Sequence, residues 1–347
     1  MQVRAEGGVE YDSNVERAEQ VDNTEATRVV GSGAGRFVGS ASRFLHFGER
    51  WSLALSGGGA VKGFAEPSAQ PENIALVQAS PGLSVRLLPG TILASNVSYY
   101  DSFQKRSPDT RDFRSVTPGM QLQQQVGGGA IGVGGGYRWF TFKPIAAFNF
   151  VGPMAFLNYR RAFLADLEVE PDAADWELSA TVSHERRLFE GERCRMDACV
   201  ADSQRVDDFT VLGAEIVRTG DHLLGFGGAL QVNGSNSFGT GLTRIATHVK
   251  AALSLPWELT LTLRAELLFT RYADRVPLAT DPITAQPRAS IEEESRNTVR
   301  AELTRALGEH IEGIVRYVYY TNDLAGGPVN YNRHTLLMAL AFSFDRD

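Results

Sequence analysis

The dominant pattern in the sequence is an alternation of apolar and polar residues with a period of two. It is clearest over residues 257–271, where Leu259, Leu261 and Leu263 alternate with threonines and Arg264. Successive side chains of a β-strand point to opposite faces, so this segment predicts a strand with one apolar and one polar face. Strands of soluble sheets usually have about five or six residues. The greater length of this segment favours a tilted strand that crosses a lipid bilayer.

The end of the chain repeats the pattern. One face of the predicted last strand carries Leu336, Met338, Leu340, Phe342 and Phe344. A final strand with alternating apolar residues and a near-terminal aromatic resembles the signal that outer-membrane barrels present to their insertion machinery. Three residues follow Phe344, a small departure from a terminal aromatic. An ordinary amphipathic strand is the alternative.

Short and long connections alternate along the chain. The short ones are expected at residues 47–50, 88–90, 126–129, 219–222, 255–258 and 307–310. The longer polar ones are expected at residues 13–26, 65–72, 104–111, 189–206, 233–241, 274–293 and 322–330. Tight turns at one end and longer loops at the other are typical of transmembrane barrels. Residues 164–175 are long for a tight turn.

The fold class predicted is all-β: a closed antiparallel transmembrane β-barrel of about 16 strands, with 14 or 18 as alternatives. Residues 1–347 are expected to form one barrel domain. Each unpaired backbone group costs several kcal/mol in lipid, so the sheet must close. We therefore expect residues 3–12 to pair with residues 333–344. Aromatic girdles at the membrane interfaces are expected from Trp51, Trp139, Trp176, Trp257, Tyr317, Tyr319 and Phe344.

Composition narrows the class of protein further. Hydrophobic residues make up 43% of the chain, yet none of its apolar runs approaches the roughly 18 residues that a membrane-spanning helix needs. The net charge of −7 argues against nucleic acid as a partner. A barrel reaches the outer membrane with the help of a cleaved signal peptide, which this sequence lacks. We therefore expect the chain to be the mature form, with Met1 as an added start.

The two cysteines, Cys194 and Cys199, lie close together in a polar segment. Such a pair indicates a local disulfide in an oxidising compartment. A metal site is the alternative, but two thiols without a neighbouring Cys or His fall short of a zinc set.

The sequence contains few candidates for catalytic or cofactor-binding residues. Of the six histidines, His184 has the only adjacent serine, Ser183, and neighbours on a strand point to opposite faces, so an enzyme is not expected. The glycine-rich residues 127–136 include no lysine and precede no helix, which argues against a phosphate-binding loop and leaves no cofactor predicted. These glycines either allow close approach of a partner or an inward loop, or relieve barrel curvature.

Charged residues on the predicted inner faces are candidates to line the lumen. They are Glu185, Lys250, Arg264, Glu266, Arg300, Glu302, Glu312 and Arg316. They come from neighbouring strands, so cross-strand ion pairs are expected. Mixed charges can create a transverse field in a water-filled pore, or they can seal the lumen as a paired network. Both alternatives stay open.

Several short motifs carry a family resemblance. They are residues 11–15 (Tyr-Asp-Ser-Asn-Val), residues 233–237 (Asn-Gly-Ser-Asn-Ser) with Arg244, and Arg316-Tyr317 with residues 320–322. With the last strand, they resemble porin-like outer-membrane β-barrels of proteobacteria, including myxobacteria. Barrels of this kind occur beside exopolysaccharide-export genes or as the barrel part of surface-lipoprotein export factors.

The resemblance implies a location in the bacterial outer membrane. The function expected first is a channel or export pore for polar solutes or a polysaccharide-type polymer. The second is a structural barrel that anchors an envelope complex for surface motility, polysaccharide or lipoprotein display, and an outer-membrane enzyme is a distant third. The expected partners are outer-membrane lipid and lipopolysaccharide, the insertion machinery, and other envelope proteins.

Overall fold

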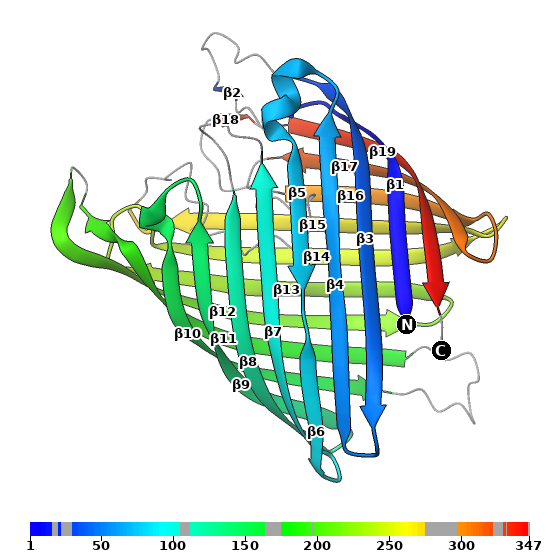
Figure 1. Cartoon of the computed structure of the whole chain (residues 1–347), viewed down its shortest axis with the longest axis horizontal. Helices are drawn as coiled ribbons and strands as arrows, with labels where there is room; N and C mark the ends of the chain where they lie inside the picture. The colour runs from blue at the N-terminus through cyan, green and yellow to red at the C-terminus, as the bar shows by residue number, and fades with distance from the viewer. Residues whose placement is uncertain are drawn as a thin grey trace.

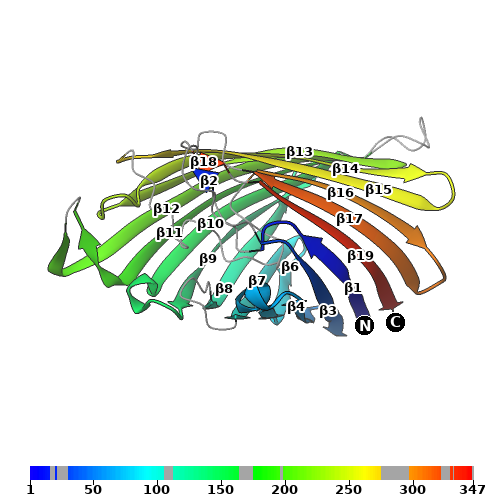
Figure 2. The same ribbon diagram turned by 90° about the horizontal axis from the view of Figure 1, so that it is seen from above.

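The β-strands of the computed structural model form a closed antiparallel ring, seen from two directions in Figures 1 and 2. The structure describes residues 1–15, 20–21, 30–104, 112–163, 175–195, 198–274, 297–321, 329–330 and 332–345. The wall is built from β1 (Gln2–Asp12), β3 (Ser32–Phe47), β4 (Trp51–Phe64), β5 (Ile74–Ala79), β6 (Gly82–Leu88), β7 (Thr91–Gln104), β8 (Phe113–Val126), β9 (Gly129–Phe142), β10 (Phe150–Phe163), β11 (Asp175–Cys194), β12 (Cys199–Thr219), β13 (His222–Ser235), β14 (Leu242–Leu255), β15 (Leu259–Tyr272), β16 (Asn297–Ala306), β17 (Ile311–Thr321) and β19 (Asn332–Asp345). Two short strands, β2 (Gln20–Val21) and β18 (Val329–Asn330), pair with each other.

The sheet has 17 segments but the barrel has 16 strands, as the sequence predicted. The reason is that β5 and β6 are successive halves of one strand, both paired with β4 and β7. Pro81 interrupts this strand because proline has no backbone N–H to donate. The Ser80 N–H still donates to the Ser56 carbonyl at 2.7 Å, and the Val97 N–H donates to the Pro81 carbonyl at 3.0 Å. The interruption therefore leaves the wall continuous.

The ring closes where the first strand meets the last. β1 pairs with β19 from Gln2 opposite Asp345 to Asp12 opposite Thr335, which confirms the predicted pairing. One further hydrogen bond, from the Ser13 N–H to the His334 carbonyl at 3.0 Å, extends the pairing beyond β1. Both termini consequently lie side by side at one end of the barrel (Figure 1).

Along each strand, alternate side chains face inward and outward. In β15, Leu259, Leu261 and Leu263 are on the outer face, while Arg264 is on the inner face opposite Lys250 of β14. The predicted faces of this segment are therefore confirmed. The strand itself begins at Leu259, because Trp257 and Glu258 have positive φ of 63° and 59° and form the preceding turn.

The two ends of the barrel differ. The turn end carries both termini and the short turns at residues 48–50, 89–90, 127–128, 220–221, 256–258 and 307–310. The loop end carries the 3-10 helices η1 (Pro67–Glu72) and η2 (Ala146–Phe148) and the tip of the β11–β12 hairpin. In the described residues, no helix has the length and apolar character needed to cross a membrane. Residues 164–174, and most of the loops predicted at residues 13–26, 104–111, 274–293 and 322–330, lie outside the described residues.

One predicted loop is wrong. Residues 189–206 were expected to form a long polar connection, but β11 continues to Cys194 and β12 begins at Cys199. The polar side chains of this region include Arg205, whose inward side chain is buried and paired inside the barrel, so polarity did not mark a loop. Cys194 and Cys199 face each other across the hairpin tip and form the predicted disulfide.

Outward aromatic side chains gather near both ends of the strands. Trp51, Trp176, Trp257 and Phe344 lie at the turn end, and Trp139 and Tyr317 lie toward the loop end, all more than a third exposed. Exposed aliphatic side chains such as Val9 and Met338 lie between them. This arrangement agrees with the predicted girdles around an apolar band.

Apolar side chains form two clusters inside the barrel at the loop end. Phe140 stacks between Phe113 and Phe150, with ring centroids 5.7 and 4.9 Å apart. Across the lumen, Val15 from the first loop packs with the inward Ala34 and Phe64. These two clusters hold Val15, η1 and η2 against the wall, so side chains occupy part of the lumen at the loop end.

The closing pair of strands provides a test of the fold. A side chain at Gly8 would meet the Met338 carbonyl and lie 2.7 Å from the Ala339 Cβ, whereas one at the adjacent Gly7 has its nearest neighbour, Phe37, at 3.8 Å. Gly8→Val should therefore lower the free energy of unfolding by about 1–3 kcal/mol. Gly7→Val is the matched control and should leave it nearly unchanged. Urea unfolding followed by tryptophan fluorescence measures both; equal effects would contradict the register at the closure.

Candidate functional site in the barrel lumen

All eight residues predicted to line the lumen lie on inner faces, but they fall into two environments. Arg316 and Glu185 are buried, and Glu302 is largely buried. Lys250, Arg264, Glu266 and Glu312 keep at least a third of their side-chain surface exposed. Glu185 lies toward the loop end and Glu312 at the turn end, whereas the other six, among them Arg300 with a side chain 32% exposed, lie near mid-height.

A continuous chain of ion pairs crosses the line where the barrel closes. We call it the charged seam; it consists of Arg300 and Glu302 on β16, Arg316 on β17, Arg333 on β19, Glu6, Glu10 and Asp12 on β1, Arg36 on β3 and Lys62 on β4. Most of these side chains are buried. The seam therefore joins six neighbouring strands through their side chains as well as through their backbones.

Arg316 is the centre of the lower part of the seam. Its guanidinium donates to both carboxylate oxygens of Glu6, each at 3.2 Å, and also to Glu302. Arg300 approaches the same oxygen of Glu302 at 2.8 Å. On the other side, Arg36 lies 3.5 Å from Glu6. One arginine thus links β16 to β1 across the intervening strand β19.

Asp12 is the centre of the upper part. It is completely buried and accepts two hydrogen bonds from Arg333, at 2.9 and 2.5 Å. Lys62 lies 3.1 Å from Asp12 and 2.5 Å from Glu10, and Arg36 lies 3.4 Å from Glu10. Because two charges removed from water are tolerated only with good geometry and full pairing, each of these groups depends on its partners.

A row of cations lies at mid-height on the opposite side of the lumen from β5–β9. Lys250 is directly opposite Arg264, and Arg264 is directly opposite Arg300. Like charges at facing positions destabilise a sheet. Each cation has a carboxylate in reach: Glu215 lies 2.7 Å from Lys250, Glu266 lies 3.5 Å from Arg264, and Glu302 pairs with Arg300. The row is therefore balanced by neighbouring acids, yet the Arg264 side chain is 58% exposed and remains in contact with water.

Two glycines make the long-range pairing of this row possible. Lys250 and His248 are on β14, whereas their acceptor Glu215 is on β12, with β13 between them. A Cβ at Gly225 would lie 2.5 Å from Cε of Lys250, and one at Gly227 would lie 2.6 Å from Cε1 of His248. The bare backbone of β13 thus lets both side chains lie flat against the wall instead of projecting into the lumen.

The glycine-rich strand β9 has a similar role. A side chain at Gly132 would collide with Gln121 and Asn158, which meet over it, and one at Gly134 would lie 2.5 Å from the Phe156 ring. At these two glycines the bare backbone makes room for side chains of the neighbouring strands β8 and β10, not for the partner or inward loop considered from the sequence.

Glu185 and Glu312 have different surroundings from the cation row. Glu185 accepts from Arg138 at 3.2 Å and from Arg187 at 2.9 Å, close to the aromatic cluster at the loop end. Arg187 also lies over the Phe209 ring, 4.2 Å from its centroid. Glu312 lies at the turn end and pairs with Arg4 at 2.9 Å. Glu185 is therefore part of a packed wall, while Glu312 is near the rim.

The neighbours Ser183 and His184 point to opposite faces of the wall, as strand alternation predicts. Ser183 faces inward, whereas His184 faces outward and contacts Thr210 at 3.0 Å. Within the described ranges, no group of three or more His, Cys, Asp or Glu side chains could hold a metal ion.

Sequence reasoning missed most of the charged seam. Glu6, Glu10, Asp12, Arg36, Lys62 and Arg333 were not among its candidates. A signal was present, because Glu6, Glu10 and Asp12 are separated by even numbers of residues and must share a face of one strand. Asp12 ends the predicted first strand, and no pattern in the sequence indicates that Lys62 would reach it.

Comparisons with known proteins support the architecture. No protein-family model matches the chain, and no curated protein matches it in sequence. Among solved structures, Pseudomonas aeruginosa OccK2 (OpdF), in complex with glucuronate, aligns with a TM-score of 0.50 and 12% identity over 99% of this chain and 98% of that one. A bacterial polysaccharide outer membrane secretin aligns with a TM-score of 0.46 and 9% identity over 98% of each chain. The chain therefore has the porin-like fold of outer-membrane β-barrels.

The two environments of lumen arginines can be compared by mutation. Arg316→Met leaves Glu6 and Glu302 without a central partner in a buried position, so we expect a loss of roughly 3–5 kcal/mol in unfolding free energy. Arg264→Met removes an arginine whose side chain is 58% exposed, and the loss should stay below about 1 kcal/mol. Denaturant unfolding in detergent measures both, and similar losses would show that the seam does not hold the barrel closed.

Proposed function

We propose that the protein is an outer-membrane channel that lets polar solutes cross through its lumen. The observation that supports this most directly is that the side chains of Lys250, Arg264 and Glu266, on the inner wall, are exposed to water. A barrel that only fills a membrane has no need for solvated charges at mid-height, whereas a pore lined by mixed charges orients polar solutes.

The outer surface fits the same proposal. Aromatic side chains near both strand ends border exposed aliphatic residues, as expected for a wall in contact with lipid. Short turns face the periplasm in bacterial barrels and longer loops face outward. We therefore place the turn end in the periplasm and the loop end, with the Cys194–Cys199 hairpin tip, outside the cell.

A finer proposal is that the cargo is a sugar or a polysaccharide-type polymer. The support for this proposal is the set of neutral hydroxyl and amide side chains on the inner faces of β3–β8, among them Ser40, Gln78, Asn96 and Gln121. Such groups exchange hydrogen bonds with hydroxylated solutes at little desolvation cost compared with charged groups.

A second candidate function is a structural barrel that anchors an envelope complex. The charged seam favours it, because buried and mutually paired side chains such as Asp12 and Arg333 do not act on passing solutes. The aromatic cluster and Val15 also narrow the loop end.

Planar-bilayer recording separates the two functions. The purified barrel should produce stable, stepwise ion conductance if the lumen is a pore. A barrel that inserts, as shown by protease protection in liposomes, but gives no conductance would support the anchor instead.

The cation row should set the ion selectivity of the channel. A single charge about 8 Å from a passing ion contributes about 0.5 kcal/mol in water. Each of Lys250→Met and Arg264→Met should therefore lower the anion-to-cation permeability ratio by about twofold. Arg305→Met removes the same charge from the outer face and is the control. Reversal potentials in a salt gradient measure the ratio; an unchanged value in both lumen variants would contradict an open pore lined by this row.

The orientation can be tested with the disulfide. After mild reduction of intact cells that express the barrel, a membrane-impermeant maleimide should label Cys194 and Cys199 at the loop end. With both cysteines changed to serine, Glu49→Cys at the turn end should be labelled only after cell lysis. The opposite labelling pattern would place the loop end in the periplasm.

A further inference from the structure

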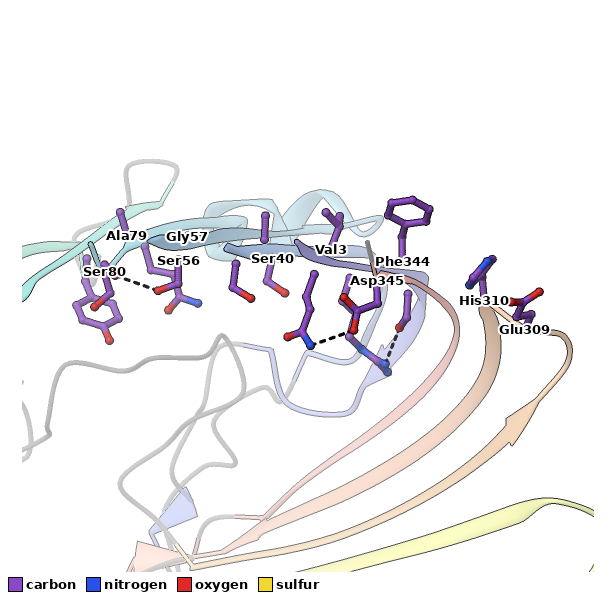
Figure 3. Close-up of a pocket in the computed structure, with 17 residues that line it drawn as sticks. Val3, Ser40, Ser56, Gly57, Ala79, Ser80, Glu309, His310, Phe344 and Asp345 are labelled. Atoms are coloured by element: carbon purple, nitrogen blue, oxygen red, sulfur yellow. Dashed lines mark hydrogen bonds between the residues drawn. The ribbon is translucent and has the colours of Figure 1, made fainter. Parts of the chain in front are cut away.

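A hollow of about 860 Å³ lies on the inner wall at the turn end, beneath β1, β3, β4, β5 and β7 (Figure 3). This volume is within the range of about 300–1,000 Å³ that is usual for small-molecule sites. Figure 3 shows Ser40, Ser56 and Ser80 on the lumen side of the sheet, while Val3 and Phe344 point to the other side. The hollow is therefore separate from the charged seam and opens toward the turn end.

The strand register places one polar row across the hollow. Ser40 is opposite Gly58, Gly58 is opposite Gln78, and Gln78 is opposite Tyr100. The next row holds Ser42 opposite Ser56. A Cβ at position 58 would lie 2.6 Å from the Gly39 carbonyl, so no side chain fits between Ser40 and Gln78 in this row. Hydroxyl and amide groups thus surround a gap of bare backbone.

The edge of the hollow holds one paired cation and acidic groups. Arg4 contacts Glu312 at 2.9 Å and donates to Ser343 at 3.1 Å, and Gln2 donates to Asp345 at 3.2 Å. Glu309 and Asp345 both line the edge. The edge therefore offers little attraction to an anion.

The neutral groups of the hollow, by contrast, are uncommitted. In the part of the chain that the structure describes, the side chains of Ser40, Ser42, Gln78 and Tyr100 make no hydrogen bond. Together they provide hydroxyls that donate and accept, an amide with both functions, and an aromatic ring. Aromatic rings combine an apolar face with a polar tip, which suits a sugar ring with its apolar face and hydroxyl edges.

The neutral surface continues around the wall beyond the hollow. The inner faces of β6–β10 carry Ser84, Asn96, Ser98, Gln121, Gln123 and Asn158 at matching heights. The opposite wall carries Lys250, Arg264 and Glu266. A solute that contacts the inner faces of β7 and β8 therefore meets mainly hydroxyl and amide groups, whereas Arg86 on β6 and Arg160 on β10 bring charge to the strands beside them.

We propose that this hollow binds an uncharged, polyhydroxylated solute, namely a neutral sugar or short oligosaccharide that enters from the turn end. The inference rests on the proposed function, since it names the solute class of the same lumen. Binding is carried by the row of Ser40, Gln78 and Tyr100, with Gly58 leaving room for the sugar ring.

Calorimetry on the detergent-solubilised full chain tests the proposal, with maltohexaose as the neutral probe and glucuronate as the charged one. Maltohexaose should bind and glucuronate should not. Each of Gln78→Leu and Tyr100→Leu should weaken maltohexaose binding by about five- to tenfold, the effect of losing one or two hydrogen bonds. Gln231→Leu, an inward glutamine on β13, is the matched control and should bind as the parent does.

Conductance recordings of the same proteins in planar bilayers show whether a negative result concerns the sugar site or the channel itself. Conductance with maltohexaose-induced blocking events that disappear in Tyr100→Leu supports both. Conductance and no maltohexaose binding by calorimetry overturns the sugar site and leaves the channel. Binding without conductance overturns the channel alone. Equal weakening by Gln231→Leu would overturn the assignment to this hollow.

Discussion

The structure depends on one constraint: every backbone N–H and C=O group of the wall needs a partner where no water can supply one. In hydrocarbon each unpaired group costs several kcal/mol, so a sheet with free edges is not stable there. The pairing of β1 with β19 removes both edges at once. The period-two alternation follows from the same constraint, because a ring of strands has one face for lipid and one for the lumen.

The side chains at the closure strengthen the same junction. The charged seam extends from β16 to β4 and is centred on β1, the strand that must find β19 from the far end of the chain. A slip of one residue in the register would turn Glu6, Glu10 and Asp12 toward lipid. The seam therefore specifies the register more strongly than the apolar face can, since small residues such as Ala5 and Gly7 on the outer side discriminate little between registers.

The lumen changes character along its length. At the loop end, buried ion pairs and aromatic stacking hold the wall together beside Val15, η1 and η2. From mid-height to the turn end, charges such as Arg264 and Glu312 contact water, and the inner faces of β7 and β8 carry mainly neutral hydroxyl and amide groups. Glycines on inner faces, such as Gly225 and Gly132, let long side chains lie flat, which preserves the width of the lumen.

The architecture was accessible from the sequence because strand periodicity depends on local spacing. The alternation in β15, the closing pair of strands, the strand count and the Cys194–Cys199 disulfide were all predicted. The charged seam was not, because Arg316 and Lys62 reach across a neighbouring strand and such contacts depend on the register of the whole ring. The extended β11–β12 hairpin was missed for a different reason: Arg205 looks like a loop residue, yet it is buried over the Phe189 ring and pairs with Asp207 on its own strand.

The central claim, a ring of strands with lipid on one face and water on the other, can be tested directly along β15. Single cysteines at each position from Leu259 to Tyr272, in a background without Cys194 and Cys199, would carry nitroxide labels in liposomes. Over Leu259–Glu266, accessibility to oxygen should be high at odd-numbered positions and accessibility to a water-soluble nickel chelate high at even-numbered ones, whereas Leu268 and Thr270 are buried inside the barrel and should be accessible to neither. A helical period, or equal accessibility on both faces, would contradict the barrel.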